Sequence, residues 1–591
     1  MDEKNNKKVK NAKQTLLKLV KYISVYKFRV LVALIAGVSS IIINVITPRL
    51  ISKIINEIYN SVTKTININI HYITNIIFEL LGLYLLGVLL LYLQGYIIAN
   101  ISVKLTFTLR KNMDEKINKL PISYFDEVPN GEILARLTSD VERITSVLRY
   151  SVTEVVNAVV TIIGIIAMMY TINWICATVT VATVFFTYVI MQFIVKKSQR
   201  FFKEERKFIG KTNGYIEEIY SQHNIVKAFN AEKSALEVFE VLNDELYKSS
   251  WKASFFSALL TPIVFFMSNI NYLIIVITAC VLTVNGKISV GDIPAFIQYV
   301  KNLNQPMNQM ANITSNFQGI LAAAERVFDF LEEEEEKVET NTIDLPKSIN
   351  GNIRFENVTF SYKKGETTIN RISLEVKAGQ KVALVGATGS GKTTLVKLLM
   401  RFYELNSGKI YIDGIDITKF SKNSLRSIFS MVLQDAWLYS GTIADNIKYG
   451  NINADDKQVE EVAKLAYVDN FIKILPEGYK TVLNDEATNI SQGEKQLITI
   501  ARAMLVGPQI LILDEATSSV DMNTESLIQK AMDNLMKGKT SFIIAHRLST
   551  VKNADVIFVM SHGEILEHGS HQELIKKGGY YCKMYNSQFE I

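Results

Sequence analysis

Lys381-Val-Ala-Leu-Val-Gly-Ala-Thr-Gly-Ser-Gly-Lys-Thr-Thr394 is the stretch that decides the fold of the second half of the chain. It begins as a short buried strand and runs into the helical pattern of residues 395–400. Between the two lies the pattern G-x-x-x-x-G-K-[ST], whose glycines let backbone N–H groups surround phosphates at a helix N-terminus. The sequence therefore predicts an α/β domain with a phosphate-binding loop made of Gly386, Thr388, Gly389, Ser390, Gly391, Lys392, Thr393 and Thr394.

A second motif, Ile510-Leu-Ile-Leu-Asp514-Glu515, follows about 120 residues later. Its four apolar residues predict a core strand whose acidic end enters the nucleotide site. There Asp514 would hold Mg²⁺ together with the Thr393 hydroxyl, while Lys392 would reach the β and γ phosphates. Glu515 would be the general base for the attacking water, a role worth about 10²–10⁴ in rate. Alone the motif would suit a strand and a solvated acidic turn, but beside the phosphate loop it predicts nucleotide hydrolysis.

The first half of the chain carries long apolar runs instead. A helix that crosses a bilayer needs roughly 20 apolar residues, and six segments reach that length. The predicted spans are residues 28–49, 73–100, 153–173, 174–195, 256–284 and 289–322. Only a short polar break around Asn173 separates the third span from the fourth, which predicts a tight hairpin.

The sixth segment differs from the others because polar side chains interrupt it. These are Lys301, Asn302, Asn304, Gln305, Asn308 and Gln309. We expect this helix to face protein or a water-filled cavity, since lipid would not solvate such groups. Glu79 lies near the outer end of the second segment, where both a structural role and a substrate contact stay open. The structural role is favoured.

Basic residues set the predicted orientation of the chain in the membrane. They concentrate in the N-terminal tail and in the two long loops that follow the second and fourth spans. Because such loops remain on the cytoplasmic side, the N-terminus and the nucleotide-binding domain are predicted to be cytoplasmic. Both loops also have helical periodicity, so they are expected to extend the spans as long rods.

The composition agrees with two parts of different character. The chain has 591 residues, of which 48% are hydrophobic and 21% charged, and its net charge is +6. This length requires more than one domain. The small net charge gives no support to nucleic-acid binding. Three widely spaced cysteines indicate neither a metal site nor a disulfide framework.

Asn489-Ile-Ser-Gln-Gly-Glu494 is the most specific of the remaining motifs. It resembles the L-S-G-G-Q signature of ABC transporters, so the domain looks like a nucleotide-binding domain of that family. In the family the signature serine and glycine contact the γ-phosphate of ATP held by the opposite subunit. The resemblance assigns this role to Ser491 and Gly493.

Four more residues match family positions. The resemblance implies that Tyr362 stacks on adenine and that Gln434 senses Mg²⁺ and the attacking water. It also implies that Asp521 communicates between the two ATP sites and that His546 binds the γ-phosphate. Without the family pattern, Tyr362 would be interpreted as a core aromatic and His546 as a structural histidine.

The order of the parts resembles an exporter-type half-transporter along the whole chain beyond the N-terminal tail. The resemblance implies an α-helical membrane domain with six transmembrane helices and long cytoplasmic loop helices, followed by an α/β P-loop ATPase domain, the type IV exporter architecture. Two stretches in the cytoplasmic loops look like the coupling helices of the family. The predicted parts are a basic tail and lead-in helix at 1–26, a transmembrane domain at 27–326 with coupling helices near 122–130 and 216–226, a linker at 327–350 and the nucleotide-binding domain at 351–591. The glutamates at 332–336 predict a solvated connector.

Two departures from the family pattern lie on the surface that would face a partner. The signature contains Gln492 and Glu494 where glycine and glutamine are usual, and residues 481–487 replace a glycine-flanked acid. Each ATP site needs a signature loop from a second half-transporter, so two chains must pair. A heterodimer with one weakened site is favoured slightly. A homodimer stays open, because Glu494 still offers a hydrogen-bond acceptor.

The resemblance implies ATP-driven, Mg²⁺-dependent export of amphipathic small molecules, lipids or peptides by alternating access. The place of action would be the plasma membrane of a bacterium. The rival hypothesis is an ATP-gated channel or a regulatory subunit, and the intact Glu515 and His546 count against it. The six spans exclude a soluble ATPase that acts on nucleic acid. The substrate itself has no short motif in such proteins.

Overall fold

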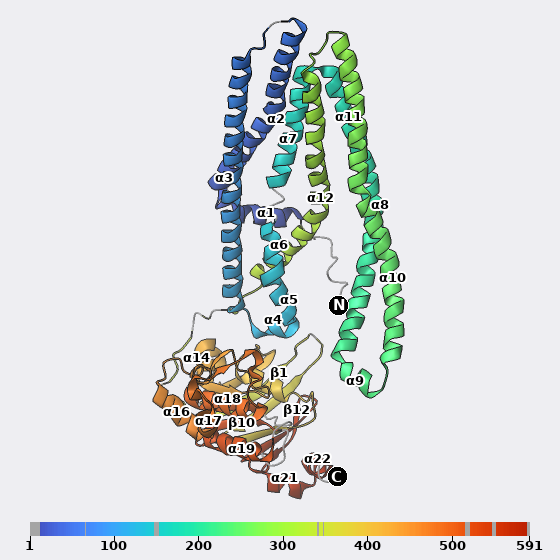
Figure 1. Cartoon of the computed structure of the whole chain (residues 1–591). Coiled ribbons are helices and arrows are strands. Elements are labelled where there is room, and N and C mark those ends of the chain that lie inside the picture. Colours follow the sequence, from blue (N-terminus) through green and yellow to red (C-terminus); the bar gives the residue numbers. More distant parts are fainter. Residues whose placement is uncertain are drawn as a thin grey trace. The chain divides into compact units, whose positions relative to one another are not determined.

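The computed structural model describes residues 12–65, 67–146, 153–337, 339, 342–346, 348–363, 365–514, 521–545 and 551–587. It divides the chain into two compact units. The first unit is helical and the second is α/β (Figure 1). The first contains Met1–Leu120 and Val128–Glu334, and the second contains Pro121–Glu127 and Glu335–Ile591.

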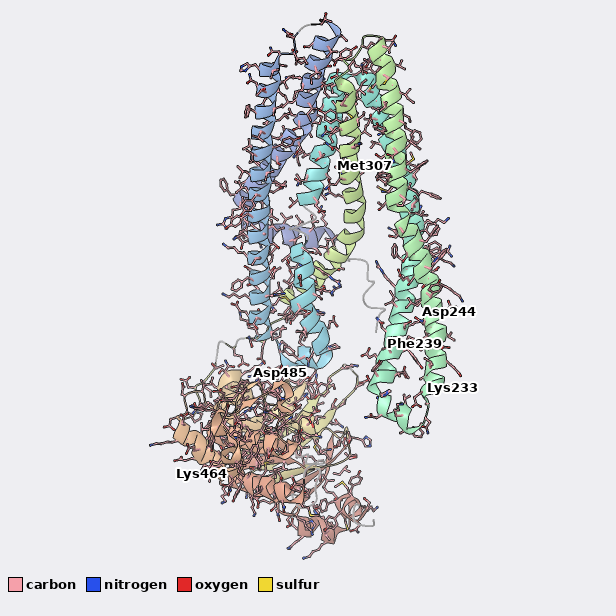
Figure 2. The ribbon with its side chains drawn as sticks, viewed as in Figure 1. Lys233, Phe239, Asp244, Met307, Lys464 and Asp485 are labelled. Carbon is pink, nitrogen blue, oxygen red and sulfur yellow. The ribbon has the colours of Figure 1, made fainter. Side chains whose placement is uncertain are left out.

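The first unit is built from long helices joined by short turns (Figure 1). Its elements are α1 (Ala12–Ser24), α2 (Lys27–Thr63), α3 (Ile70–Ile117), α5 (Asn130–Ala135), a π-helical turn (Arg136–Asp140), α6 (Val141–Ser146), α7 (Thr153–Ile172), α8 (Trp174–Ser221), α9 (His223–Ala228), α10 (Glu232–Ala258), α11 (Leu260–Val284) and α12 (Asp292–Glu332). In Figure 2, Lys233, Phe239 and Asp244 mark α10, which packs along α8.

Within the described ranges, five helical segments are long and apolar enough to cross a membrane. They are α2, α3, α7, α8 and the pair α10–α11, and they contain the first five predicted spans except for Asn173, the last residue of the third. Helices α3 and α8 each have 48 residues, or about 72 Å at about 1.5 Å per residue. That exceeds the hydrocarbon thickness of about 30 Å. Both helices therefore continue well beyond a bilayer, as the periodicity of the loops predicts.

Helix α12 covers residues 292–322 of the sixth predicted span but is not one of these five segments. Its buried side includes Phe296 and Tyr299, and the Tyr299 hydroxyl donates a hydrogen bond of 2.9 Å to the Val45 carbonyl of α2. Lys301 and Asn302 are exposed on another side of the helix. These two side chains therefore avoid the packed interior of this unit, and a sixth membrane crossing stays a prediction.

The hairpin predicted at Asn173 is present. Helix α7 ends at Ile172 and α8 begins at Trp174. The Asn173 side-chain oxygen accepts hydrogen bonds from the N–H groups of Ile175 at 2.9 Å and Cys176 at 3.3 Å. These bonds satisfy two of the N–H groups that a helix start leaves without partners, so one residue is enough to end one helix and begin the next.

The second unit contains the mixed sheet β12-β11-β3-β10-β9-β6 and an antiparallel sheet β2-β1-β4-β5. Its strands are β1 (Ile353–Phe360), β2 (Ile369–Val376), β3 (Lys381–Val385), β4 (Ser407–Ile412), β5 (Ile415–Asp416), β6 (Phe429–Val432), β7 (Gly441–Thr442), β8 (Val482–Leu483), β9 (Ile510–Asp514), β10 (Thr540–Ile544), β11 (Val556–Ser561) and β12 (Glu564–Gly569). Its helices are α4 (Ile122–Glu127), α13 (Lys392–Leu399), α14 (Lys422–Ser427), α15 (Ile443–Lys448), α16 (Asp456–Leu465), α17 (Asp469–Ile474), α18 (Gln492–Val506), α19 (Met522–Met536), α21 (His571–Lys577) and α22 (Tyr580–Ser587).

The central strands are buried on both faces, which explains their uninterrupted apolar sequences. In β3, Val382 and Leu384 enter the core shared with the antiparallel sheet, while Ala383 and Val385 enter the core shared with α18 and α19. This alternation is the period of two expected for a strand. It holds the carboxyl end of β3, where the phosphate loop begins, between two packed layers.

Two details of the linker and loops differ from the sequence-based expectation. The segment predicted as a coupling helix near 216–226 is divided, because α8 continues to Ser221 and a separate helix, α9, begins at His223. The prediction of a solvated acidic connector is wrong for Glu336. Its carboxylate lies 2.7 Å from the Arg426 guanidinium and 3.3 Å from Lys422. Burial would raise the pKa of Glu336, but these cations bring it below its usual value.

Candidate functional site

The loop between β3 and α13 has the shape that phosphate binding requires. Gly386 has a φ of +155°, and a Cβ there would lie 2.2 Å from the Met560 carbonyl oxygen. Gly391 has a φ of +101°, and a Cβ there would lie 2.8 Å from Ile369 Cδ1. No larger residue fits either position without moving its neighbours. The predicted glycines therefore bring the backbone close to the start of α13.

The polar groups inside this loop are hydrogen-bond donors that suit the binding of an anion. Lys392 Nζ is folded over the loop and donates hydrogen bonds to the carbonyls of Gly386 at 2.7 Å and Ala387 at 3.0 Å. Ser390 Oγ is buried and has no hydrogen-bond partner within the described residues. The N-terminus of α13 adds N–H groups and a favourable dipole. Ser390, Lys392 and the helix start thus form a cradle that suits the phosphates of a nucleotide.

Asp514 lies at the same edge of the sheet as this loop. It ends β9 in register with Ile544 of β10, and β10 pairs in parallel with β3. Burial lowers the pKa of Lys392, and the negative charge of Asp514 offsets part of that effect. The phosphate loop and the acidic end of β9 are therefore close enough for their charges to interact. Glu515 and His546, the predicted base and γ-phosphate ligand, lie outside the described residues.

The other residues predicted for this chain's own site occupy its rim. The Tyr362 hydroxyl lies 3.2 Å from the Thr394 hydroxyl, and the residue is 44% exposed. Thr388, Gly389 and Thr393 are exposed in the loop and at the helix start. Gln434 is exposed just after β6, the strand next to β9.

The signature residues form a separate site at the start of α18. The Ser491 side chain accepts a hydrogen bond of 3.3 Å from the Glu494 N–H, and the Glu494 carboxylate accepts one of 2.7 Å from the Ser491 N–H. This reciprocal pair is a capping box. Gly493 is buried beside it, and Asp521 caps α19 by accepting from Thr524 N–H at 3.0 Å. In the described part of the chain, no hydrogen bond or ion pair joins Ser491 or Gly493 to the phosphate loop.

Sequence reasoning did not find the contact that α4 makes within the second unit. The Asp126 carboxylate lies 2.9 Å from Lys397 Nζ and accepts a hydrogen bond from the Tyr403 hydroxyl. Burial alone would raise the pKa of Asp126, but the bonds from Tyr403 and Lys397 bring it below its usual value. Lys397 lies on α13, the helix that starts at the phosphate loop. The only sequence signal was the proline- and glycine-bounded turn around α4.

Comparison with known proteins identifies both units. Residues 30–307 match the family model of the ABC transporter transmembrane region, and residues 369–518 match that of the ABC transporter. The chain belongs to the ABC transporter family. Its membrane region precedes its nucleotide-binding domain, so it is an exporter-type half-transporter.

Named relatives cover most of the half-transporter. It is 44% identical over 505 residues to a fatty acid ABC transporter ATP-binding/permease protein of Mycobacterium tuberculosis, which is 85% of this chain and 80% of that protein. It is 39% identical over 588 residues to an uncharacterized ABC transporter ATP-binding protein of Bacillus subtilis, 99% and 96% of the two chains. It is 35% identical over 524 residues to an ATP-dependent lipid A-core flippase of Legionella pneumophila, 88% and 89% of the two chains.

These matches confirm the predicted architecture, a helical membrane domain followed by a P-loop ATPase domain. The half-transporter is a multi-pass membrane protein that binds nucleotide and couples ATP hydrolysis to export. Its architecture implies pairing with a second half-transporter.

Proposed function

We propose that the half-transporter exports lipid-like amphipathic molecules across the plasma membrane by alternating access. Two observations together carry this proposal. The phosphate-loop site is intact. The chain is also extensively similar to proteins named for fatty acids and for lipid A-core. Both named compounds join an apolar part to a polar group. The N-terminus and the nucleotide-binding domain are proposed to be cytoplasmic, in agreement with the basic loops.

The proposed chemistry assigns a role to each group at the phosphate loop. Lys392 and the N–H groups of α13 would hold the β and γ phosphates, and Thr393, Asp514 and Gln434 would hold or sense Mg²⁺. Mg²⁺ would neutralise charge that develops on the transferred phosphoryl group. Glu515 would accept a proton from the attacking water, with His546 at the γ-phosphate. Tyr362 would stack on adenine.

Reconstitution in lipid vesicles tests this function. Export is expected to require ATP, and an exported amphiphile is expected to raise the ATPase rate. Glu515→Gln, purified in the same way, should bind ATP but move no amphiphile. Passive flow that needs bound ATP but no hydrolysis would contradict a pump and support the gated channel. Absence of ATP-dependent movement for fatty acids, phospholipids and other lipid-like amphiphiles would contradict the proposed cargo class.

We further propose that the half-transporter works in a heterodimer with one weakened ATP site. Support comes from Glu494, whose carboxylate lies at the start of α18, where the signature would meet a partner's γ-phosphate. The negative charge of the Glu494 carboxylate would repel the negative charge of that γ-phosphate. A tag on this chain is expected to purify a second, different half-transporter, and that partner is expected to lack the catalytic glutamate. Purification of a homodimer alone would contradict this proposal.

Glu494→Gln isolates the effect of this charge, because glutamine can keep the capping box. The weakened site is expected to bind ATP about two- to tenfold more tightly, which corresponds to roughly 0.4–1.4 kcal/mol of relieved repulsion. Glu573→Gln is a matched control, since Glu573 forms the same capping box with Ser570 at the start of α21. An unchanged ATP affinity in Glu494→Gln would show that the carboxylate does not weaken the site.

A further inference from the structure

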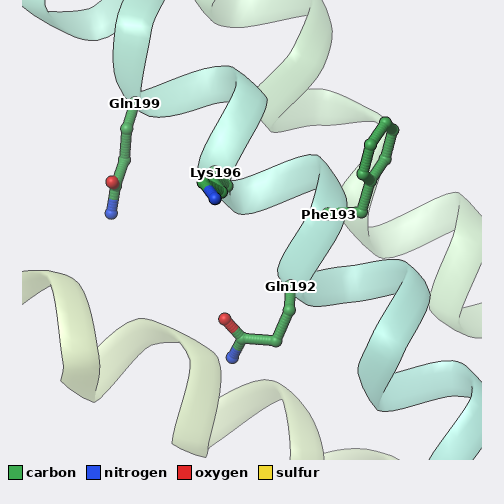
Figure 3. A pocket seen from close by; sticks show the side chains of 4 residues that line it. All are labelled: Gln192, Phe193, Lys196 and Gln199. Atoms are coloured by element: carbon green, nitrogen blue, oxygen red, sulfur yellow. The ribbon is translucent and has the colours of Figure 1, made fainter.

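One side of α8 carries three polar side chains in a segment that is otherwise suited to lipid. Gln192, Lys196 and Gln199, with Phe193, line a pocket of about 430 Å³. Spacings of four and three residues place the three polar groups on the same side of a helix. Figure 3 shows them extending together from α8 while the Phe193 ring points away. The pocket therefore offers one ammonium group and two carboxamides.

Lys196 is available to bind a ligand. In the part of the chain that the structure describes, it has no carboxylate within ion-pair distance, although its neighbours do have partners. Lys197 Nζ lies 5.1 Å from the centre of the Phe256 ring, and Arg200 lies 3.6 Å from Glu204. Among the described residues, Lys196 therefore has no ion-pair partner, whereas the next two cations along α8 are engaged.

The position of Lys196 along α8 indicates how deep it lies in the membrane. It follows the start of α8 at Trp174 by 22 residues, which is about 33 Å along the helix at about 1.5 Å per residue. The hydrocarbon core of a bilayer is about 30 Å thick. With the proposed orientation, Lys196 therefore lies at the level of the inner headgroups. An ionisable side chain at this boundary of a membrane helix is a candidate functional site.

The same side of α8 changes character along its length. Two to three turns before Lys196, it exposes Phe185, Tyr188 and Val189, with 62%, 50% and 48% of their surfaces accessible. Two turns after Lys196, the exposed side chain is Lys203. Along this side of α8, an apolar stretch is thus followed by the amide and ammonium groups of the pocket and then by the positive charge of Lys203. This order matches a long apolar tail that ends in an anionic headgroup.

We propose that Gln192, Lys196 and Gln199, the α8 headgroup site, bind the carboxylate of a long-chain amphiphile while its tail lies along the apolar part of α8. This inference rests on the proposed export of amphiphiles and narrows the cargo to an acidic one. A single ammonium group balances a single carboxylate charge, and two carboxamide NH₂ groups can donate to its oxygens. Phe185 and Tyr188 supply the contact that a short, tailless carboxylate cannot use.

Binding of oleate to the purified full-length complex in phosphatidylcholine nanodiscs tests the site without ATP. Lys196→Gln is expected to weaken oleate binding about tenfold, whereas Lys196→Arg should keep most of it. Lys197→Gln makes the same change at the next residue and should leave binding unchanged. Oleyl alcohol has the same tail without the charge, so its affinity should be the same in all variants. Acetate should not compete with oleate.

Each other outcome has a definite meaning. Equal oleate binding by Lys196→Gln and Lys197→Gln would overturn the headgroup site, as would an equal loss of oleyl alcohol binding or competition by acetate. If wild-type protein still exports oleyl alcohol in those cases, the proposed function survives and only the acidic headgroup is excluded. If neither amphiphile binds, is exported or raises the ATPase rate, both proposals fail.

Discussion

Lys392→Met is expected to lower the ATPase rate by about 10²–10³-fold, the range seen when one donor to a developing negative charge is removed. The structure gives the reason. Lys392 Nζ lies inside the phosphate loop, 2.7 Å from the Gly386 carbonyl oxygen, beside the place proposed for the β and γ phosphates. Methionine keeps much of the length of the side chain but cannot neutralise phosphate charge.

Two measurements separate loss of binding from loss of folding. ATP is expected to raise the melting temperature of the wild-type protein, because a ligand stabilises the state that binds it, but not that of Lys392→Met. Lys409→Met is the matched control. Lys409 is an exposed lysine of β4 that lies 3.8 Å from Asp416, so its loss should leave both properties unchanged. Normal ATP binding and hydrolysis by Lys392→Met would remove the loop from the proposed mechanism.

The geometry of the phosphate loop and of the strand before Asp514 was predictable, because each is carried by contiguous residues. The phosphate loop requires glycines at fixed spacing, and Gly386 and Gly391 show why, since their backbone has positive φ and no room for a Cβ. The apolar residues before Asp514 likewise identify a strand buried on both faces. In both cases a local pattern determines a local geometry.

Contacts between distant segments were not predictable in this way. Asp126 and Lys397 are far apart in the sequence, and each alone would be interpreted as an exposed charge. Glu336 was assigned to a solvated run, because a run of like charges does not reveal which of its members meets Arg426. Lys196 could be recognised only as one of many basic loop residues. Its significance depends on which neighbours on α8 have partners and which do not.

Asp126→Lys is expected to reduce ATP-dependent export at least about tenfold while the ATPase rate stays within about twofold, a loss within the usual range of coupling between sites. The substitution places two ammonium groups together where Asp126 now pairs with Lys397 at 2.9 Å. Glu127→Lys is a matched control, since Glu127 is the next residue of α4 and makes no ion pair within the described residues. Export of both variants is measured in vesicles, beside hydrolysis in the same samples.

The expected separation of transport from hydrolysis follows from where the pair lies. Helix α13 begins with Lys392, the proposed phosphate ligand, and carries Lys397 little more than one turn later, so one short rigid element would join a bound nucleotide to α4. Tyr403 forms a second connection, because it bonds Asp126 and its ring packs edge-on against Tyr362 with centroids 5.0 Å apart. The double variant Asp126→Lys with Lys397→Asp restores opposite charges and should recover part of the export. Full export by Asp126→Lys alone would contradict a role for the Asp126–Lys397 pair in coupling hydrolysis to transport.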